Sequence, residues 1–218
     1  MIIEALSVSL KIILLALPIS FFISMTLAYI ITEKDIWGRR IIETLLIIPM
    51  FLSPATIGYM VLVIFGNRGI LGEVVKYITG RSLIFTWGAG VIVAIIVTLP
   101  IMYEAIKNSF LNVDKEYKEA AMELGANEYQ VFRKIIFPLS KKGILSGIVL
   151  SFARAFGEFG ATILVAGNIP GKTQTIPMVM YYAIENNDKA IANKILIITL
   201  AISVATILLN NFLTKKRS

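Results

Sequence analysis

Five apolar segments, each about as long as a membrane-crossing helix, constrain this chain more than any other feature of its sequence. A helix needs about 20 mainly apolar residues to cross the roughly 30 Å hydrocarbon core of a bilayer. One soluble core cannot bury so much apolar surface in a chain of 218 residues. The pattern predicts an all-α fold, a single polytopic helical bundle over residues 1–218, with expected spans at 5–31, 44–65, 83–103, 143–166 and 195–213.

Composition agrees with a membrane protein and excludes several other classes. The chain is 57% hydrophobic and 16% charged, whereas soluble domains are about 45–50% apolar and about 25% charged. Its net charge of +7 does not favour nucleic-acid binding, because the basic residues lie between apolar segments and not on one stripe. Cysteine and histidine are absent, which excludes disulfides and thiolate ligands and removes the commonest proton shuttle. We expect no cofactor and no metal site.

Basic residues are unequally divided between the two sides of the membrane. With the N-terminus outside, the inner segments hold 13 Lys and Arg residues and the outer segments hold 7. Cytoplasmic loops carry the excess of positive charge in membrane proteins. We therefore expect a multi-pass protein of the cell membrane with its N-terminus outside and its C-terminus in the cytoplasm. The first span lacks a cleavage site and is expected to be retained. Residues 70–79 are expected to form a short outer-face helix, and residues 175–186 a short interfacial or re-entrant helix. A sixth crossing at 175–186 is the alternative, and it would place the basic C-terminus outside.

The inner loop over residues 114–138 is predicted to form two short helices. Residues 116–124 are mostly good helix formers, with Asp114 as a plausible N-cap. Gly125 can adopt the positive φ that a turn between helices requires. Pro138 is expected to end the second helix near its preceding residue. That helix has an apolar face, formed by Val131, Phe132, Ile135 and Ile136.

A spaced pattern in this loop identifies a family. An E-A-A triplet is followed by a glycine, an isoleucine and a proline, at Glu119, Ala120, Ala121, Gly125, Ile135 and Pro138. The spacing resembles the signature loop of permeases in the ATP-binding-cassette importer superfamily, with Phe137 where the family usually has leucine. The resemblance implies that the loop forms coupling helices that dock into a cleft on a separate ATPase. The expected coupling residues are Glu119, Ala120, Ala121, Gly125 and Pro138.

The same resemblance implies partners for the chain. Two ATPase subunits closing on each other need two coupling loops, and this chain has one, so a second permease copy is expected, most simply as a homodimer. An extracytoplasmic substrate-binding protein would deliver the substrate. The chain itself is not expected to be an enzyme, because ATP is hydrolysed by the partner. An ion channel or a non-transporting membrane assembly subunit would not need the E-A-A loop.

Two further stretches narrow the resemblance. The first is the GEFGAT run that ends at Thr162, and the second is the run GNIPGKTQTIP over residues 167–177. Both resemble the molybdate/tungstate permeases of this superfamily, and the similarity extends to residues 47–54 and to Leu99-Pro100. Sulfate and thiosulfate permeases look similar here and remain the alternative. The sequence does not decide between these oxyanions.

Two charged residues in the fourth span are candidates for the translocation path. Arg154 and Glu158 lie four positions apart, so they share a helix face and can pair. Charges at membrane depth are costly and are expected to face the bundle or a wet cavity. They either form a gate, with Arg154 attracting an oxyanion, or brace the helices as an ion pair. We place Thr162 and the helix-kinking Pro100 on the same path or gate.

The outer loop that begins at Gly167 superficially resembles a phosphate-binding loop. That motif needs four residues between its first glycine and Gly-Lys-Thr, and here there are three. The loop is therefore not expected to bind a nucleotide. Lys172 is either a contact for the binding protein or a solvated loop charge.

Overall fold

The structure is a computed structural model that describes residues 1–34 and 37–214. This part of the chain consists of helices joined by turns and loops, which confirms the all-α fold class. Within these residues, four helices are long and apolar enough to cross a membrane, and the number is five if one bent pair of helices counts as a single span. Residues 215–218, which contributed to the expected charge bias, lie outside the described residues. The four long helices are α1 (Ile2–Glu33), α5 (Trp87–Leu111), α8 (Phe137–Phe156) and α11 (Lys189–Thr214).

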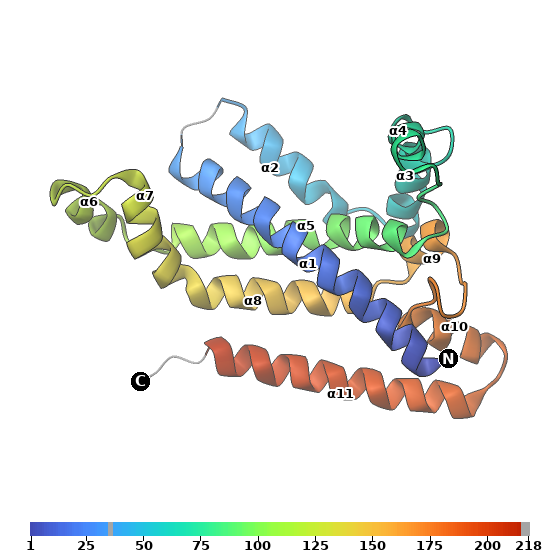
Figure 1. The fold of residues 1–218 in the computed structure, drawn as a ribbon. Coiled ribbons are helices and arrows are strands. Elements are labelled where there is room, and N and C mark those ends of the chain that lie inside the picture. Colours follow the sequence, from blue (N-terminus) through green and yellow to red (C-terminus); the bar gives the residue numbers. More distant parts are fainter. Residues whose placement is uncertain (35–36, 215–218) are drawn as a thin grey trace.

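The centre of the bundle is the packing of α1 and α8 against α5, with α1 lying diagonally across α5 (Figure 1). Small residues line the buried face of α1, including Ala16, Ser20 and Ala28. Such residues let membrane helices approach closely and form hydrogen bonds between them. The Oγ of Ser20 lies 2.8 Å from Thr98 Oγ1, and Ser24 Oγ donates to the Leu99 carbonyl over 3.3 Å. These bonds join α1 to α5 at membrane depth.

The second expected span, 44–65, is divided by a sharp bend. It comprises α2 (Arg39–Ile47), a short 3-10 turn (Ile48–Met50) and α3 (Pro54–Phe65), and the two arms differ in direction by 114°. Proline disfavours helical conformation in the residue before it, and Pro54 begins the second arm. The Ser53 Oγ accepts the Thr56 N–H over 3.1 Å and caps that arm.

The fourth expected span, 143–166, is also divided. Its first part belongs to α8, which begins earlier and ends at Phe156, and its last part is the short α9 (Gly160–Ala166). Three residues separate the two helices, and α9 packs against both α3 and α5 instead of continuing α8. The fourth crossing is therefore α8, and α9 lies at its end.

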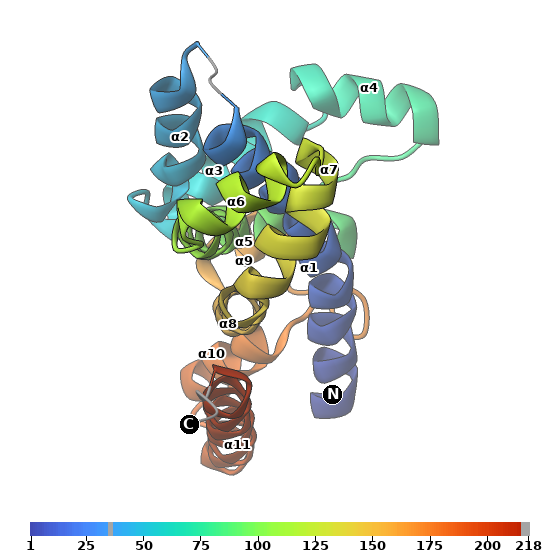
Figure 2. The same cartoon turned by 90° about the vertical axis from the view of Figure 1, so that its left-hand side faces the viewer.

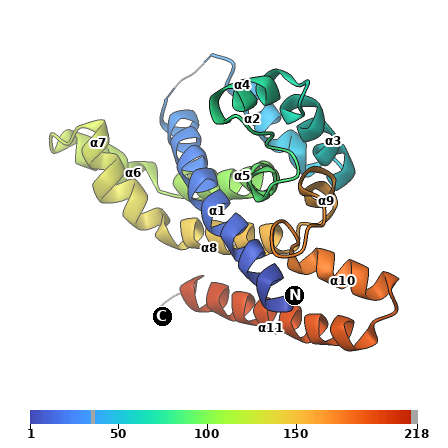
Figure 3. The ribbon, with the colours of Figure 1, turned by 45° about the vertical axis from the view of Figure 1, so that its right-hand side comes forward.

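The two ends of the bundle carry different short elements (Figures 1 and 3). One end holds α6 (Lys115–Glu123), α7 (Glu128–Val131) and the end of α11. The other holds the N-terminus, α4 (Ile70–Thr79), α9 and α10 (Ile176–Glu185). The short helices expected at 70–79 and 175–186 are present as α4 and α10.

Helix α11 lies at the edge of the bundle, where it packs against α8 and α10 (Figure 2). Ile195 is its one buried residue. Most of its other apolar side chains face outward, among them Ile197, Leu200 and Phe212. An apolar outer surface of this kind suits contact with lipid tails.

Candidate functional site

The loop that follows α5 folds as two short helices at one end of the bundle. Asp114 occupies the N-cap position of α6, although its side chain makes no capping bond. Gly125 has a φ of +86°, which is the conformation that the turn between α6 and α7 needs. Helix α7 begins with a reciprocal cap, because Asn127 Oδ1 accepts the Gln130 N–H over 2.9 Å and Gln130 Oε1 accepts the Asn127 N–H over 3.0 Å.

The structure places four of the five expected coupling residues on this loop. Glu119, Ala120 and Gly125 are exposed, whereas Ala121 packs against the buried cluster that contains Phe110 and Ile136. One side of α6 therefore rests on the bundle and the other faces outward. Four large side chains of the same loop are also exposed: Tyr117 at 57%, Met122 at 49%, Leu124 at 89% and Tyr129 at 64%. Exposed apolar groups of this size are typical of protein interaction surfaces.

The fifth coupling residue, Pro138, does not end the second helix, so that expectation is wrong. A π-helical turn over Phe132–Ile136 joins α7 directly to α8, and Pro138 lies in the first turn of α8. The Phe137 N–H donates to the Phe132 carbonyl, five residues back. This wider turn moves the backbone that a proline ring would otherwise strike. The second coupling helix is therefore continuous with the fourth membrane crossing.

An ion pair that the sequence analysis missed fixes α6 to α1. Lys118 Nζ lies 2.6 Å from Glu33 Oε1, and both side chains are less than one-fifth exposed. An aromatic contact supports the same junction, because the rings of Tyr29 and Phe132 meet edge to face at 4.7 Å. The residues are far apart in sequence, so no local pattern indicated either contact.

A second missed cluster joins α2 to α5. Glu43 Oε1 accepts from Lys107 Nζ at 3.0 Å and from the Tyr103 hydroxyl at 3.1 Å. Lys107 also pairs with Glu104 at 3.2 Å, and Arg39 approaches Glu43 to 3.8 Å. The only sequence signal was the position of Glu43 and Lys107 at the ends of apolar segments. This cluster is the principal polar link between α2 and the rest of the bundle.

Arg154 and Glu158 form the expected ion pair, although Glu158 lies in the break after α8 and not within a continuous helix. Arg154 Nη1 lies 2.5 Å from Glu158 Oε2. The other carboxylate oxygen, Oε1, accepts the Ala161 N–H over 3.0 Å and so caps the start of α9. Glu158 is 4% exposed. Its carboxylate thus joins the end of one helix to the start of the next.

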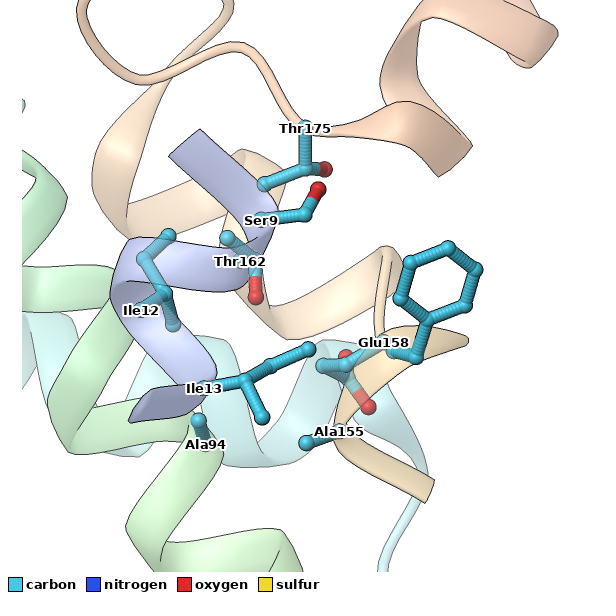
Figure 4. A pocket seen from close by; sticks show the side chains of 9 residues that line it. Ser9, Ile12, Ile13, Ala94, Ala155, Glu158, Thr162 and Thr175 are labelled. Atoms are coloured by element: carbon cyan, nitrogen blue, oxygen red, sulfur yellow. The ribbon is translucent and has the colours of Figure 1, made fainter. Parts of the chain in front are cut away.

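The path residues are only partly brought together. Thr162 and Glu158 line one small cavity with Ser9 and Thr175 (Figure 4), whereas Pro100 lies within α5 and is not among the residues that line it. The cavity has a volume of about 10 Å³, which is near the minimum for one water molecule. The cavity is therefore too small for anything larger than a water molecule. Within residues 1–34 and 37–214, no group of three acidic side chains converges to hold a metal ion.

Comparison with known families decides what kind of protein carries this loop and this bundle. The family described as "Binding-protein-dependent transport system inner membrane component" matches residues 20–217. The chain belongs to this family. It is therefore a multi-pass inner-membrane component of a transport system.

Relatives within this transport family cover almost the whole chain. The molybdenum transport system permease protein ModB of Haemophilus influenzae is 36% identical over 97% of this chain and 91% of its own length. ModB of Escherichia coli strain K12 is 35% identical over 97% of this chain and 93% of its own length. The sulfate transport system permease protein CysW of the same strain is 34% identical over 80% of this chain but 60% of its own length.

Solved structures of transport proteins share the fold. A bacterial alginate ABC transporter in complex with an alginate pentasaccharide-bound periplasmic protein aligns with a TM-score of 0.78 at 18% identity, over 98% of this chain and 78% of that chain. An amino acid ABC transporter aligns with a TM-score of 0.70, also at 18% identity, over 98% of this chain and 92% of that chain. The helical architecture is thus that of an ABC transporter permease.

Proposed function

We propose that this chain is the membrane-spanning permease of an ATP-driven importer of molybdate or tungstate. The similarity to two ModB proteins over nearly their full lengths carries this proposal. Sulfate is the second candidate, because CysW proteins are related at 29–34% identity. Molybdate and tungstate are favoured because the alignment covers 91–93% of the length of the two ModB proteins. It covers only 60–73% of the length of those CysW proteins.

In this proposal the loop over residues 114–138 couples the permease to a separate ATPase subunit. The exposed Glu119, Ala120 and Gly125 would contact the ATPase, and Ala121 would hold α6 against the bundle. Because the loop is continuous with α8, a displacement of α7 would move that crossing as a rigid body. ATP drives such a change only if it favours one of the two conformations. Pro138 would act in the junction rather than in the contact.

The partners follow from this coupling scheme. Two ATPase subunits would hydrolyse ATP, and a second copy of this chain would supply the second loop, with the path along the two-fold axis. A substrate-binding protein would deliver the oxyanion at the opposite end, near α9 and α10. The permease would contribute no catalytic residue of its own.

The proposed orientation places the N-terminus outside and α6 and α7 in the cytoplasm. The absence of cysteine makes a direct test simple, because each introduced cysteine is unique. Tyr129→Cys on α7 and Tyr77→Cys on α4 are both highly exposed positions. A membrane-impermeant maleimide should label Tyr77→Cys in intact cells and Tyr129→Cys only after the membrane is opened. The reverse pattern would refute this orientation.

The pair formed by Arg154 and Glu158 is proposed to belong to a gate together with Thr162. The closed cavity beside Thr162 and the break between α8 and α9 support a point at which the path can open. Pro100 is proposed to provide flexibility in α5 at the same depth as the bonds from Ser20 and Ser24. In this scheme Arg154 attracts the oxyanion only when Glu158 no longer neutralises it.

The function is tested by reconstituting the permease with its ATPase and binding protein in proteoliposomes. Molybdate or tungstate should stimulate ATP hydrolysis several-fold at concentrations where sulfate has no effect. Stimulation by sulfate alone would favour the second candidate. Glu119→Lys should weaken ATPase association, whereas Lys115→Glu, an exposed change in the first turn of the same helix, serves as the control. Full association of the Glu119 variant would argue against the coupling assignment.

A further inference from the structure

An open pocket lies at the end of the bundle opposite the coupling loop. It is formed where α1 meets the start of α5 and the loop between α9 and α10, and its volume is about 500 Å³. The pocket is lined by two basic residues, two aromatic residues and three hydroxyl residues: Lys11, Lys172, Phe85, Trp87, Ser7, Thr86 and Thr173. The pocket is distinct from the small cavity beside Thr162.

The pocket carries uncompensated positive charge. None of its lining residues is acidic. Within the part of the chain that the structure describes, Lys11 and Lys172 are in no ion pair. Lys11 Nζ instead lies 3.8 Å from the centre of the Trp87 ring, a cation–π contact that positions the ammonium group without neutralising it. A concave surface lined by one sign of charge raises the local concentration of the opposite ion.

Lys172 extends from a well-bonded loop. Thr173 Oγ1 donates to the Gly167 carbonyl over 3.1 Å and accepts the Ile169 N–H over 3.0 Å. A second bond across the loop joins Gln174 Nε2 to Asn168 Oδ1 at 2.9 Å. The backbone that carries Lys172 is therefore ordered by these bonds, and the Lys11 side chain is positioned by its contact with Trp87. This order lowers the cost of bringing both ammonium groups to one anion.

We propose that this pocket is a transit site for a free, doubly charged tetrahedral oxyanion, held between Lys11 and Lys172. The inference rests on the proposed function and adds a residue-level site to it. Lysine ammonium groups act on such anions as mobile point charges without bidentate geometry, so binding is weak and unselective. Weak binding suits a transit site, since an ion must leave it as readily as it enters. A lipid phosphate headgroup has the same chemistry, and the experiment separates the two.

Trp87 provides the probe for the test. The chain has two tryptophans, and the other, Trp37, is 97% exposed, so Trp37→Phe leaves Trp87 as the single reporter. The full chain is purified in neutral detergent and titrated with sodium tungstate or sulfate, with sodium chloride as the matched-ionic-strength control. We expect a saturable change in Trp87 emission at millimolar oxyanion and none with chloride. Lys11→Gln and Lys172→Gln should each raise the half-saturating concentration at least five-fold, whereas the exposed Lys76→Gln should not.

The outcomes separate this site from the proposed function. A response that is absent, or that is unchanged in both lysine variants, overturns the proposal. A parallel titration in nanodiscs compares phosphatidylcholine with phosphatidylglycerol. If only the anionic lipid changes Trp87 emission and free oxyanions do not, the pocket is a lipid site and the transit role is wrong. Oxyanion-stimulated ATP hydrolysis in the reconstituted importer is measured separately, and its failure would reject the proposed function whatever Trp87 reports.

Discussion

Lys118 of α6 donates to Glu33, at the end of α1, across 2.6 Å, and the two residues are 85 positions apart in sequence. The contact ties α6, in the proposed coupling loop, to α1, which at 32 residues is the longest helix that the structure describes. Helix α1 continues from this contact to the opposite end, where the Ser9 hydroxyl accepts the Ile176 N–H over 3.0 Å. One helix therefore contacts both the proposed coupling loop and the segment that begins α10.

Reversing one charge of this pair should loosen α6 from α1. Lys118→Glu places two carboxylates together at a site that is less than one-fifth exposed, and we expect a loss of about 1 kcal/mol of stability. Transport should fall relative to ATP hydrolysis because α6 no longer moves with the bundle. The double variant Lys118→Glu/Glu33→Lys should restore both the stability, measured by thermal unfolding, and the coupling of transport to ATP hydrolysis, measured as oxyanion uptake per ATP.

The control for this pair is Lys115→Glu, which changes the same charge at an exposed position of α6. It should leave the uptake per ATP unchanged. If the double variant is no better than the single variant, the pair does not link the two helices.

Arg154 and Glu158 should differ in what their loss costs. Arg154→Ala leaves the Glu158 carboxylate buried without its counter-ion. We expect this to lower the free energy of unfolding by about 2 kcal/mol. The loss is smaller than for a fully buried pair because the Arg154 side chain is one-third exposed. Glu158→Ala removes the acceptor for the Ala161 N–H, with a cost of about 1 kcal/mol, while Arg154 can turn toward solvent. Thermal unfolding of the purified permease should rank the two variants in this order.

Transport measurements decide between a gate and a brace. Glu158→Gln keeps an acceptor for Ala161 and removes the charge, so a gate role predicts well-assembled protein with altered transport. If Arg154→Ala and Glu158→Ala lose assembled protein equally, and transport falls only in proportion, the pair braces the helices and is not a gate.

Alanine substitutions at two glycines should affect two different properties, ATPase association and bundle stability. At Gly125 an added Cβ would meet nothing within 4 Å, but the positive φ makes alanine unfavourable by about 1–2 kcal/mol. At Gly143 an added Cβ would lie 1.8 Å from Ser109 Oγ and 3.0 Å from Ser109 Cβ. Either Ser109 gives up its hydrogen bond to the Ala105 carbonyl or α8 shifts away from α5. Gly125→Ala should weaken ATPase association with little change in bundle stability. Gly143→Ala should lower the unfolding temperature of the permease alone, and equal effects in both assays would contradict this division.

The polar link between α2 and α5 should depend more on Lys107 than on Tyr103. Tyr103→Phe removes one hydrogen bond to Glu43 and should cost about 1 kcal/mol. Lys107→Met leaves Glu43 with the more distant Arg39, and we expect a loss of about 2 kcal/mol. Protease accessibility of the segment that begins at Arg39 should rise in the same order. A larger effect of Tyr103→Phe would show that Lys107 does not dominate the cluster.

Local sequence signals predicted the features that depend on neighbouring residues. Apolar length predicted the crossings, and the glycine at position 125 predicted the turn between α6 and α7. The short apolar stretches at 70–79 and 175–186 predicted α4 and α10, because neither is long enough to span a bilayer. Spacing by four predicted that Arg154 and Glu158 would pair.

Features that depend on distant residues or on competing backbone bonds were not predictable. The pairs of Lys118 with Glu33 and of Lys107 with Glu43 exist only because the bundle brings separate helices together. Pro138 was expected to stop a helix, but the π-helical turn before it accommodates the ring. The helix expected to continue to Ala166 ends at Phe156, and the Glu158 side chain supplies the acceptor that starts α9.

The uninterrupted path from Glu128 to Phe156 has a mechanical consequence. At about 1.5 Å per residue, these 29 residues form an arm about 43 Å long. A tilt of the arm by one degree about the α7 end would displace the Phe156 end by about 0.75 Å. A tilt of about four degrees would therefore displace that end by about the diameter of a water molecule. Small angular changes imposed on α7 are thereby magnified beside Arg154, in the last turn of α8.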